Sequence, residues 1–223
     1  MPRSPDPARA RLVSAGERLF AERGIDNVSL REISRESGAR NVIALQHHFK
    51  DREGLLAAIV TKHRIRVGER RHRILDEYEA DARIDLERYS AALVEPLAAC
   101  LLDDDGGRDF LRIFADLMNR PRPEWLRPQD EEREDSLDRW RRLGNHVLRP
   151  VQIRLHRRYA AILYVSTELA RCARIARNDL DVALLTSSAI DIVMAIIDGP
   201  VRSRTEELLI ARDRARGTLA QAP

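Results

Sequence analysis

Residues 29–49 read SLREISRESGARNVIALQHHF and decide how the first part of the chain folds. Ser29 and Glu32 have the spacing of a capping box, in which the serine caps a helix and the glutamate reaches back to its amide. A helix should therefore begin directly after Ser29, and Gly38 suits the left-handed conformation that ends a helix. Asn41 suits the cap of a second short helix. The pattern predicts a helix-turn-helix, whose second helix can enter a DNA major groove.

This motif offers side chains that suit base edges and phosphates. Arginine reads guanine edges, glutamine and asparagine read adenine, and small apolar groups contact thymine methyl groups. The sequence does not decide which side chain contacts which group, and the same spacing also fits a three-helix unit that serves only for packing. The candidate DNA-binding residues are Ser29, Arg31, Arg40, Asn41, Val42, Ile43, Ala44, Gln46, His47, His48, Lys50 and Arg52.

A first helix is predicted ahead of this motif. Asp6 followed by Pro7 is typical of a helix start, and apolar residues then recur at helical spacing until Gly24, so we expect a helix over 7–23. Its apolar stripe would cover the inner faces of the two short helices. Residues 1–5, which precede it, are expected to form a mobile arm.

A fourth helix is predicted after the motif. Asp51 suits its N-cap, which would place Arg52 beside free backbone amides, where a phosphate fits. We expect this helix to continue through the basic run 62–73. That run is either a solvated helix face or a direct DNA contact.

The composition favours an all-α protein. Of the 223 residues, 43% are hydrophobic, 34% are charged and only 4% are aromatic, which suits a helix-rich globule better than a β-sandwich or barrel. The formal net charge is only +3, so any argument for nucleic-acid binding must come from where the charges lie. Cys100 and Cys172 lie far apart without metal-type spacing. We therefore expect buried reduced thiols and a cytoplasmic protein.

Neither a membrane segment nor catalytic chemistry is predicted. The most apolar run, 182–197, contains Asp191 and is expected to be too short to span a bilayer, and residues 2–11 lack the apolar region of a signal peptide. The chain has no glycine-rich phosphate loop, nucleophile elbow or paired metal ligands. The acidic run 103–105 lacks the spacing of a calcium loop. We expect no enzyme activity, no cofactor and no metal.

The remaining chain is predicted to be a succession of amphipathic helices over 86–101, 110–118, 137–148, 150–176 and 180–197. Pro96 is expected to kink the first of them. The last is apolar on more than one face, so it must be buried, and a subunit interface is one way to bury it. The charged tail 202–223 is expected to add a helical turn or two at 208–210 and to fray.

Four short motifs follow one another in the N-terminal part: FAERG at 20–24, SLREISRESG at 29–38, HHF at 47–49 and DREGL at 51–55. In order and spacing, this segment resembles the N-terminal domain of the TetR family of bacterial transcriptional repressors. Two departures stand out. His47 occupies the place of a tyrosine that contacts phosphate in the commonest form, and the loop 40–43 is one residue longer. A protonated His47 would bind phosphate more strongly, so we expect DNA affinity to rise toward acid pH.

The resemblance implies an all-helical dimer with a DNA-binding domain over 1–52, a ligand-binding and dimerisation domain over 53–215 and a frayed tail over 216–223. It also implies an effector pocket among the middle helices and an interface formed by the last two long helices. Aromatic or lone polar groups on apolar stripes are the candidate pocket residues, although each also suits core packing: Tyr89, Phe114, Met118, Trp140, Tyr159, Tyr164 and Glu168. The candidate interface residues are Leu169, Cys172, Leu184, Ile190, Val193 and Ile197.

From the residues and the resemblance together we expect a bacterial one-component transcriptional regulator. It would be a repressor that binds an inverted-repeat operator in double-stranded DNA as a homodimer and is released by a small-molecule effector. The alternative is a helical oligomeric adaptor whose N-terminal motif contacts protein. Only DNA binding predicts an affinity that falls steeply as salt rises.

Overall fold

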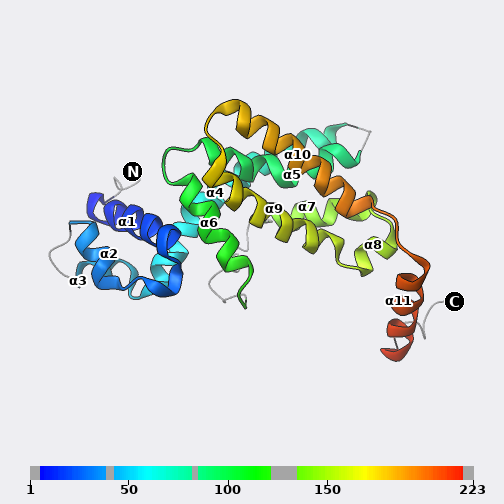
Figure 1. Cartoon of the computed structure of the whole chain (residues 1–223), viewed down its shortest axis with the longest axis horizontal. Helices are drawn as coiled ribbons and strands as arrows, with labels where there is room; N and C mark the ends of the chain where they lie inside the picture. Colours follow the sequence, from blue (N-terminus) through cyan, green and yellow to red (C-terminus); the bar gives the residue numbers. More distant parts are fainter. Residues whose placement is uncertain (1–5, 39–42, 82–84, 122–134, 218–223) are drawn as a thin grey trace.

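The fold is described from a computed structural model, which places residues 6–38, 43–81, 85–121 and 135–217 (Figure 1). Every regular element in these ranges is a helix, so the predicted all-α class is confirmed. The elements are α1 (Pro7–Arg23), η1 (Ile25–Asn27), α2 (Leu30–Glu36), α3 (Ile43–Phe49), α4 (Arg52–Ala80), α5 (Leu86–Ala98), η2 (Ala99–Leu102), α6 (Gly107–Met118), α7 (Ser136–Leu143), η4 (Gly144–His146), α8 (Pro150–Arg154), α9 (Arg157–Ile175), α10 (Asp179–Asp198) and α11 (Ser203–Ala215).

The helix ends of the N-terminal part follow the predicted local signals. The Asp6 carboxylate accepts the amide of Ala8 at 2.9 Å and caps α1. The hydroxyl of Ser29 accepts the amide of Glu32 at 3.2 Å, and the Glu32 carboxylate accepts the amide of Ser29 at 2.8 Å, so the capping box of α2 is confirmed. Gly38 has a φ of +74°, the left-handed conformation that glycine adopts most readily.

Helices α1 to α3 form a small body at one end of the molecule (Figure 1). Its core contains Ile33 of α2 and Leu45 of α3, both fully buried, together with Leu55 and Ile59 from the first turns of α4. Helix α4 is continuous over 29 residues and also enters the core of the larger part of the chain. Helix α6 also belongs to both, since its Ile113 and Leu117 lie in the N-terminal core and its Phe110 and Leu111 lie in the larger one. The two cores are therefore joined by α4 and α6, and the domain boundary after residue 52 stays a prediction.

Helices α5 to α10 pack with the second half of α4 around a larger core. At its centre the rings of Tyr89 and Trp140 stack with centroids 4.6 Å apart, and the Trp140 indole donates to the Tyr89 carbonyl at 2.8 Å. Gly144 permits this contact, because a Cβ there would lie 2.1 Å from the Tyr89 hydroxyl oxygen.

The expected long helix over 150–176 is wrong, because the chain breaks into α8 and α9 at His156. This residue has a φ of +55°, a left-handed conformation in which a helix cannot continue. Gln152 gives the physical reason, since its side chain donates to Asp198 at 3.0 Å and accepts the Arg149 amide at 2.8 Å. These bonds hold α8 against the end of α10, so the chain must turn before α9 begins.

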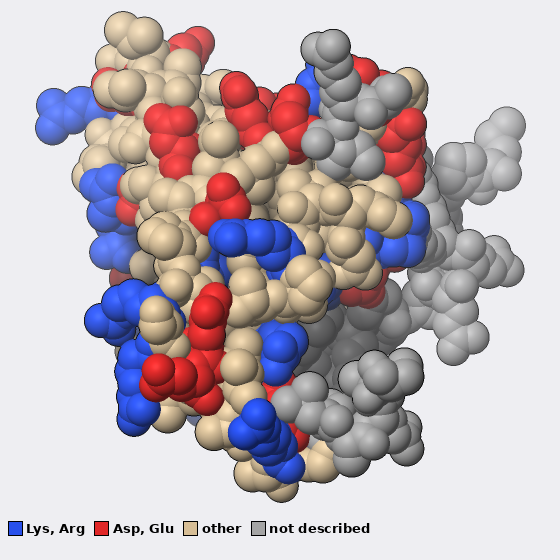
Figure 2. All heavy atoms as spheres, turned by 90° about the vertical axis from the view of Figure 1, so that its right-hand side faces the viewer, with Lys and Arg blue, Asp and Glu red and all other residues tan. Residues whose placement is uncertain are grey.

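The tail is more ordered than predicted, since α11 contains 13 residues instead of a turn or two. Leu209 is buried, and Asp213 forms ion pairs with Arg154 of α8 and with Arg212. Basic and acidic side chains are interspersed over this end of the molecule (Figure 2). The predicted arm at 1–5 and the last six residues of the predicted frayed tail, 218–223, lie outside the described residues.

Helix α10 has 20 residues and a mean hydropathy of 2.0 over its most apolar 18-residue window. Among the described helices it alone is long and apolar enough, by length and composition only, to cross a membrane, and it extends beyond the predicted run 182–197 at both ends. It packs against α5 and α9. Cys100 and Cys172 are free and buried, as predicted, and burial raises the pKa of both thiols to about 11.

Candidate functional site

Helix α3 has one face buried in the N-terminal core and one face exposed to solvent. Leu45 and Phe49 are buried in the N-terminal core, and the guanidinium of Arg9 lies 5.1 Å from the centre of the Phe49 ring. Gln46 and His47 point to solvent, and Ile43 is 68% exposed. A short helix that is anchored on one side and solvated on the other has the geometry that insertion into a major groove requires.

The other candidate DNA-binding side chains lie in several environments. Arg31 and Lys50 are exposed, and Lys50 has a φ of +65° directly after α3. His48 is half-buried, with its Nε2 3.5 Å from a carboxylate oxygen of Asp6. The positions of Arg40, Asn41 and Val42 and the side chain of Ala44 lie outside the described residues.

Two candidate residues also have structural tasks. Arg52 donates to the carbonyls of Ile25 at 3.1 Å and Val28 at 2.8 Å, so its guanidinium holds the turn that precedes α2. Ser29 is the N-cap of α2. The structure thus gives both residues a role in positioning the motif, and their DNA contacts stay predictions.

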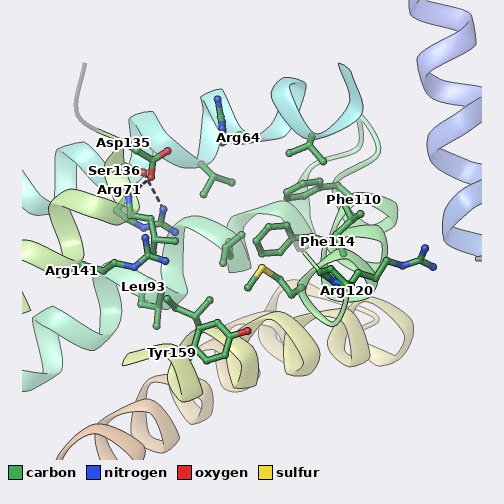
Figure 3. A pocket seen from close by; sticks show the side chains of 18 residues that line it. Arg64, Arg71, Leu93, Phe110, Phe114, Arg120, Asp135, Ser136, Arg141 and Tyr159 are labelled. Atoms are coloured by element: carbon green, nitrogen blue, oxygen red, sulfur yellow. Dashed lines mark hydrogen bonds between the residues drawn. The ribbon is translucent and has the colours of Figure 1, made fainter. Parts of the chain in front are cut away.

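A cavity of about 450 Å³ lies between α4, α5, α6, α7 and α9 (Figure 3). Of the predicted pocket residues, Phe114, Met118 and Tyr159 line it. Tyr89 and Trp140 are instead buried in the core, and Tyr164 and Glu168 are not part of the lining. The lining consists of Val60, Arg64, Val67, Arg71, Leu93, Leu97, Phe110, Phe114, Leu117, Met118, Arg120, Pro121, Asp135, Ser136, Leu137, Arg141, Tyr159 and Ile162.

Arg71 is a buried cation in the wall of this cavity, with 5% of its surface exposed. Its Nε donates to the carbonyl of Ala92 at 3.0 Å, and its Nη1 donates to the hydroxyl of Ser136 at 3.0 Å. The first bond replaces a missing helical hydrogen bond in α5. Pro96 lies four residues after Ala92 and has no amide hydrogen to donate to the Ala92 carbonyl. Burial lowers the pKa of Arg71 to about 10; the charge of Asp135 acts in the opposite direction and raises it, and the charge of Arg141 lowers it by less.

A buried polar contact connects the cavity with α1. Phe110 lines the cavity and stacks on His63, with ring centroids 4.5 Å apart. His63 is fully buried, and its Nε2 lies 2.5 Å from Oε1 of Glu17 in α1, which is only 2% exposed. Lys62 donates to the other carboxylate oxygen of Glu17 at 3.0 Å. Phe110 in the cavity wall is therefore connected to α1 through two contacts, one between Phe110 and His63 and one between His63 and Glu17.

Sequence reasoning did not include Glu17, Arg71 or Ser136 among the site residues. A signal was present for the first two, because each lies on an otherwise apolar stripe of its helix. Glu17 shares a face with Val13 and Phe20, and Arg71 shares one with Val67. No group of His, Cys, Asp and Glu side chains in the described part of the chain could hold a metal ion.

The candidate interface residues divide between the core and the surface. Leu169, Cys172, Val193 and Ile197 are buried within the chain's own core, and Ile190 is half-buried. Leu184 is 68% exposed. Leu180, which is 78% exposed, lies one turn before it, and Ile192, which is 40% exposed, lies two turns after it, with the exposed polar residues Ser187, Ser188 and Asp191 in between.

Comparison with known proteins identifies the first part of the chain. Residues 12–59 match the family model described as "Bacterial regulatory proteins, tetR family". No curated protein matches the chain. The solved structure titled "Crystal structure of superantigen PfiT" is similar over 89% of this chain and 100% of that chain, with 14% identity and a TM-score of 0.39. A similarity this low carries no argument about function.

Proposed function

The N-terminal part of this chain is a TetR-family helix-turn-helix domain, and from this premise we propose that the chain is a cytoplasmic, dimeric repressor that a small molecule releases from its operator. The observation that carries the proposal is the combination of a solvated recognition helix α3 with a cavity that contacts α1 through buried side chains. A regulator of this kind needs both parts, together with a physical connection between them.

DNA binding is supported by the outer face of α3. Gln46 suits adenine, His47 and Lys50 suit phosphates, and the exposed Ile43 suits a thymine methyl group. Selection of bound fragments from a random DNA pool tests this assignment. We expect an inverted repeat with half-sites about one helical turn apart, roughly 34 Å. The affinity for the selected site should fall steeply with salt, and an affinity that does not change with salt would favour the adaptor alternative.

Dimerisation is supported by the exposed apolar side chains of α10, which are Leu180, Leu184 and Ile192. Large apolar side chains are costly to expose to water, and a second copy of the chain would cover them. Sedimentation velocity on the full chain tests this proposal. A monomer at micromolar concentration would contradict it.

Release by an effector is supported by the contacts from Phe110 through His63 to Glu17. Glu17→Gln keeps a polar side chain but removes the charge that holds Lys62, and Glu22→Gln is a matched control on the exposed side of α1. We expect Glu17→Gln to bind the selected DNA while a cavity ligand that releases the wild type releases this variant less. Equal release from both variants would show that the signal does not pass through Glu17.

A further inference from the structure

We propose that the cavity binds an amphipathic anion, with a carboxylate against Arg71 and an apolar body against Phe114 and Met118. The inference rests on the proposed function of the cavity as the effector site, and it names the chemical class of the effector. It follows from three properties of the cavity wall, which are its apolar middle, one fixed cation and an excess of arginine over acidic side chains in the lining.

The middle of the cavity is apolar. Phe110 and Phe114 stack with ring centroids 5.5 Å apart, and Leu97, Met118 and Ile162 continue the surface. The volume of about 450 Å³ lies within the range of roughly 300–1,000 Å³ that is usual for sites of drug-sized ligands. A ligand must therefore bring an apolar body to displace water from this wall.

Arg71 is held in place before a ligand arrives. The carbonyl of Ala92 and the hydroxyl of Ser136 fix two sides of its guanidinium, and both partners are neutral. Within the described part of the chain Arg71 forms no ion pair, and its Nη2 has no hydrogen-bond partner. The charge of Asp135 acts on Arg71 without forming an ion pair with it. A buried cation that no carboxylate contacts is costly, so a ligand carboxylate would gain a charge-assisted hydrogen bond and would lower that cost. The preorganised geometry reduces the entropy lost on binding.

The charged side chains in the whole lining are mostly arginines. Arg141 approaches the same end of the cavity, although it also pairs with Asp138 at 2.5 Å (Figure 3). Arg64 adds a further positive charge to the lining. The opposing charge is Asp135, whose carboxylate accepts the Leu137 amide at 2.9 Å as the N-cap of α7.

The fourth lining arginine lies away from this end. Arg120 is neutralised by Asp26 and Asp116, with nearest oxygens at 2.7 and 3.0 Å, and in Figure 3 its side chain points away from Arg71. A cationic ligand would meet Arg71 and Arg141 unfavourably. A neutral ligand would leave the cost of the buried charge in place.

The test uses three ligands with one apolar chain and different head groups, which are decanoate, 1-decanol and decylamine. Isothermal titration calorimetry with the full-length protein near neutral pH measures each affinity. We expect decanoate to bind about 10-fold or more tightly than decanol, and decylamine to bind most weakly, because a hydrogen bond to a charged group discriminates by roughly that factor. Acetate, which lacks the apolar chain, should not compete with decanoate.

The variant Arg71→Met removes the charge and keeps much of the side-chain length. We expect it to lose the preference for decanoate over decanol and to change the affinity for decanol less than about threefold. Arg88→Met is the matched control, since Arg88 is an exposed arginine that pairs with Asp81 and is not part of the lining. If Arg71→Met folds poorly, the same change is made together with Pro96→Ala, which gives the Ala92 carbonyl its own helical donor.

Failure of the inference can be told apart from failure of the proposed function. The inference is overturned if decanol binds the wild type as well as decanoate, if decanoate does not bind at millimolar concentration, or if both backgrounds of Arg71→Met keep the carboxylate preference. Release of the selected DNA is measured separately. Decanoate that binds through Arg71 but leaves the DNA affinity unchanged would support the inference and would contradict effector release.

Discussion

The contact between Arg71 and the carbonyl of Ala92 predicts a thermodynamic coupling between Arg71 and Pro96. Without Arg71, a fully buried carbonyl in α5 has no donor, because residue 96 has no amide hydrogen. An unpaired buried polar group costs about 1–3 kcal/mol, and removal of the buried charge offsets part of this cost. We expect Arg71→Met to lower the free energy of unfolding by about 1–3 kcal/mol.

Pro96→Ala changes this result, because an alanine amide can donate to the Ala92 carbonyl as in an ordinary helix. On its own the substitution should be neutral or stabilising, since proline in a helix interior costs up to about 3 kcal/mol relative to alanine. In the Pro96→Ala background we expect Arg71→Met to lower the free energy of unfolding by less than about 1 kcal/mol. This corresponds to a coupling energy of about 1–2 kcal/mol between the two positions.

Equilibrium urea unfolding of the wild type, the two single variants and the double variant at one protein concentration measures the coupling. The fixed concentration matters because association between copies adds to the apparent stability. Arg88→Met combined with Pro96→Ala is the control and should be additive, because Arg88 is exposed and pairs with Asp81. If Arg71→Met lowers the free energy of unfolding equally in the wild type and in Pro96→Ala, then Arg71 does not compensate for the missing amide hydrogen of Pro96.

Four further predictions concern the motif and the surface. Ser29→Ala should lower the free energy of unfolding by about 1 kcal/mol in urea titrations, because α2 loses its cap. Hydrogen bonds from the amide and hydroxyl of Ser29 lower the pKa of Glu32. The ionised Glu32 therefore stabilises the fold at neutral pH, and this stabilisation is lost as pH falls through the lowered pKa. In Glu32→Gln the urea midpoint should fall less between about pH 7 and pH 3 than in the wild type. In binding titrations Gln46→Ala should change the preference between DNA sequences, whereas Lys50→Ala should weaken all sequences alike and lower the salt slope by about 1. Leu184→Asp should shift sedimentation toward the monomer, and an unchanged sedimentation coefficient would exclude this face from the interface.

The parts of the fold that could be predicted depend on residues close together in the chain. Ser29 and Glu32, or Asp6 and the amide of Ala8, interact within one helical turn, so their spacing alone determines the helix ends. The break at His156 could not be predicted in this way. It depends on a hydrogen bond from Gln152 to Asp198, 46 residues later, and nothing near His156 indicates a turn.

The candidate site shows the same limit. Helical spacing shows which side chains share a face, but it does not show whether the opposite helix fills the space or leaves a cavity. Trp140 and Phe114 both lie on apolar stripes, yet the Trp140 ring is covered by Tyr89 whereas Phe114 borders open volume. Arg71 is the sharper case, since its role depends on a proline in another helix.

The uninterrupted length of α4 has a mechanical consequence. At about 1.5 Å per residue, about 24 Å of rigid helix separates Leu55 in the N-terminal core from Arg71 in the cavity wall. A tilt of about 5° at the cavity end would displace the far end by about 2 Å. Two copies related by a twofold axis would add their displacements to about 4 Å, comparable to the rise of about 3.4 Å between neighbouring base pairs. A small side-chain movement in the cavity wall can thus change the spacing of the two DNA-binding ends by about one base-pair step, although α4 does not bend.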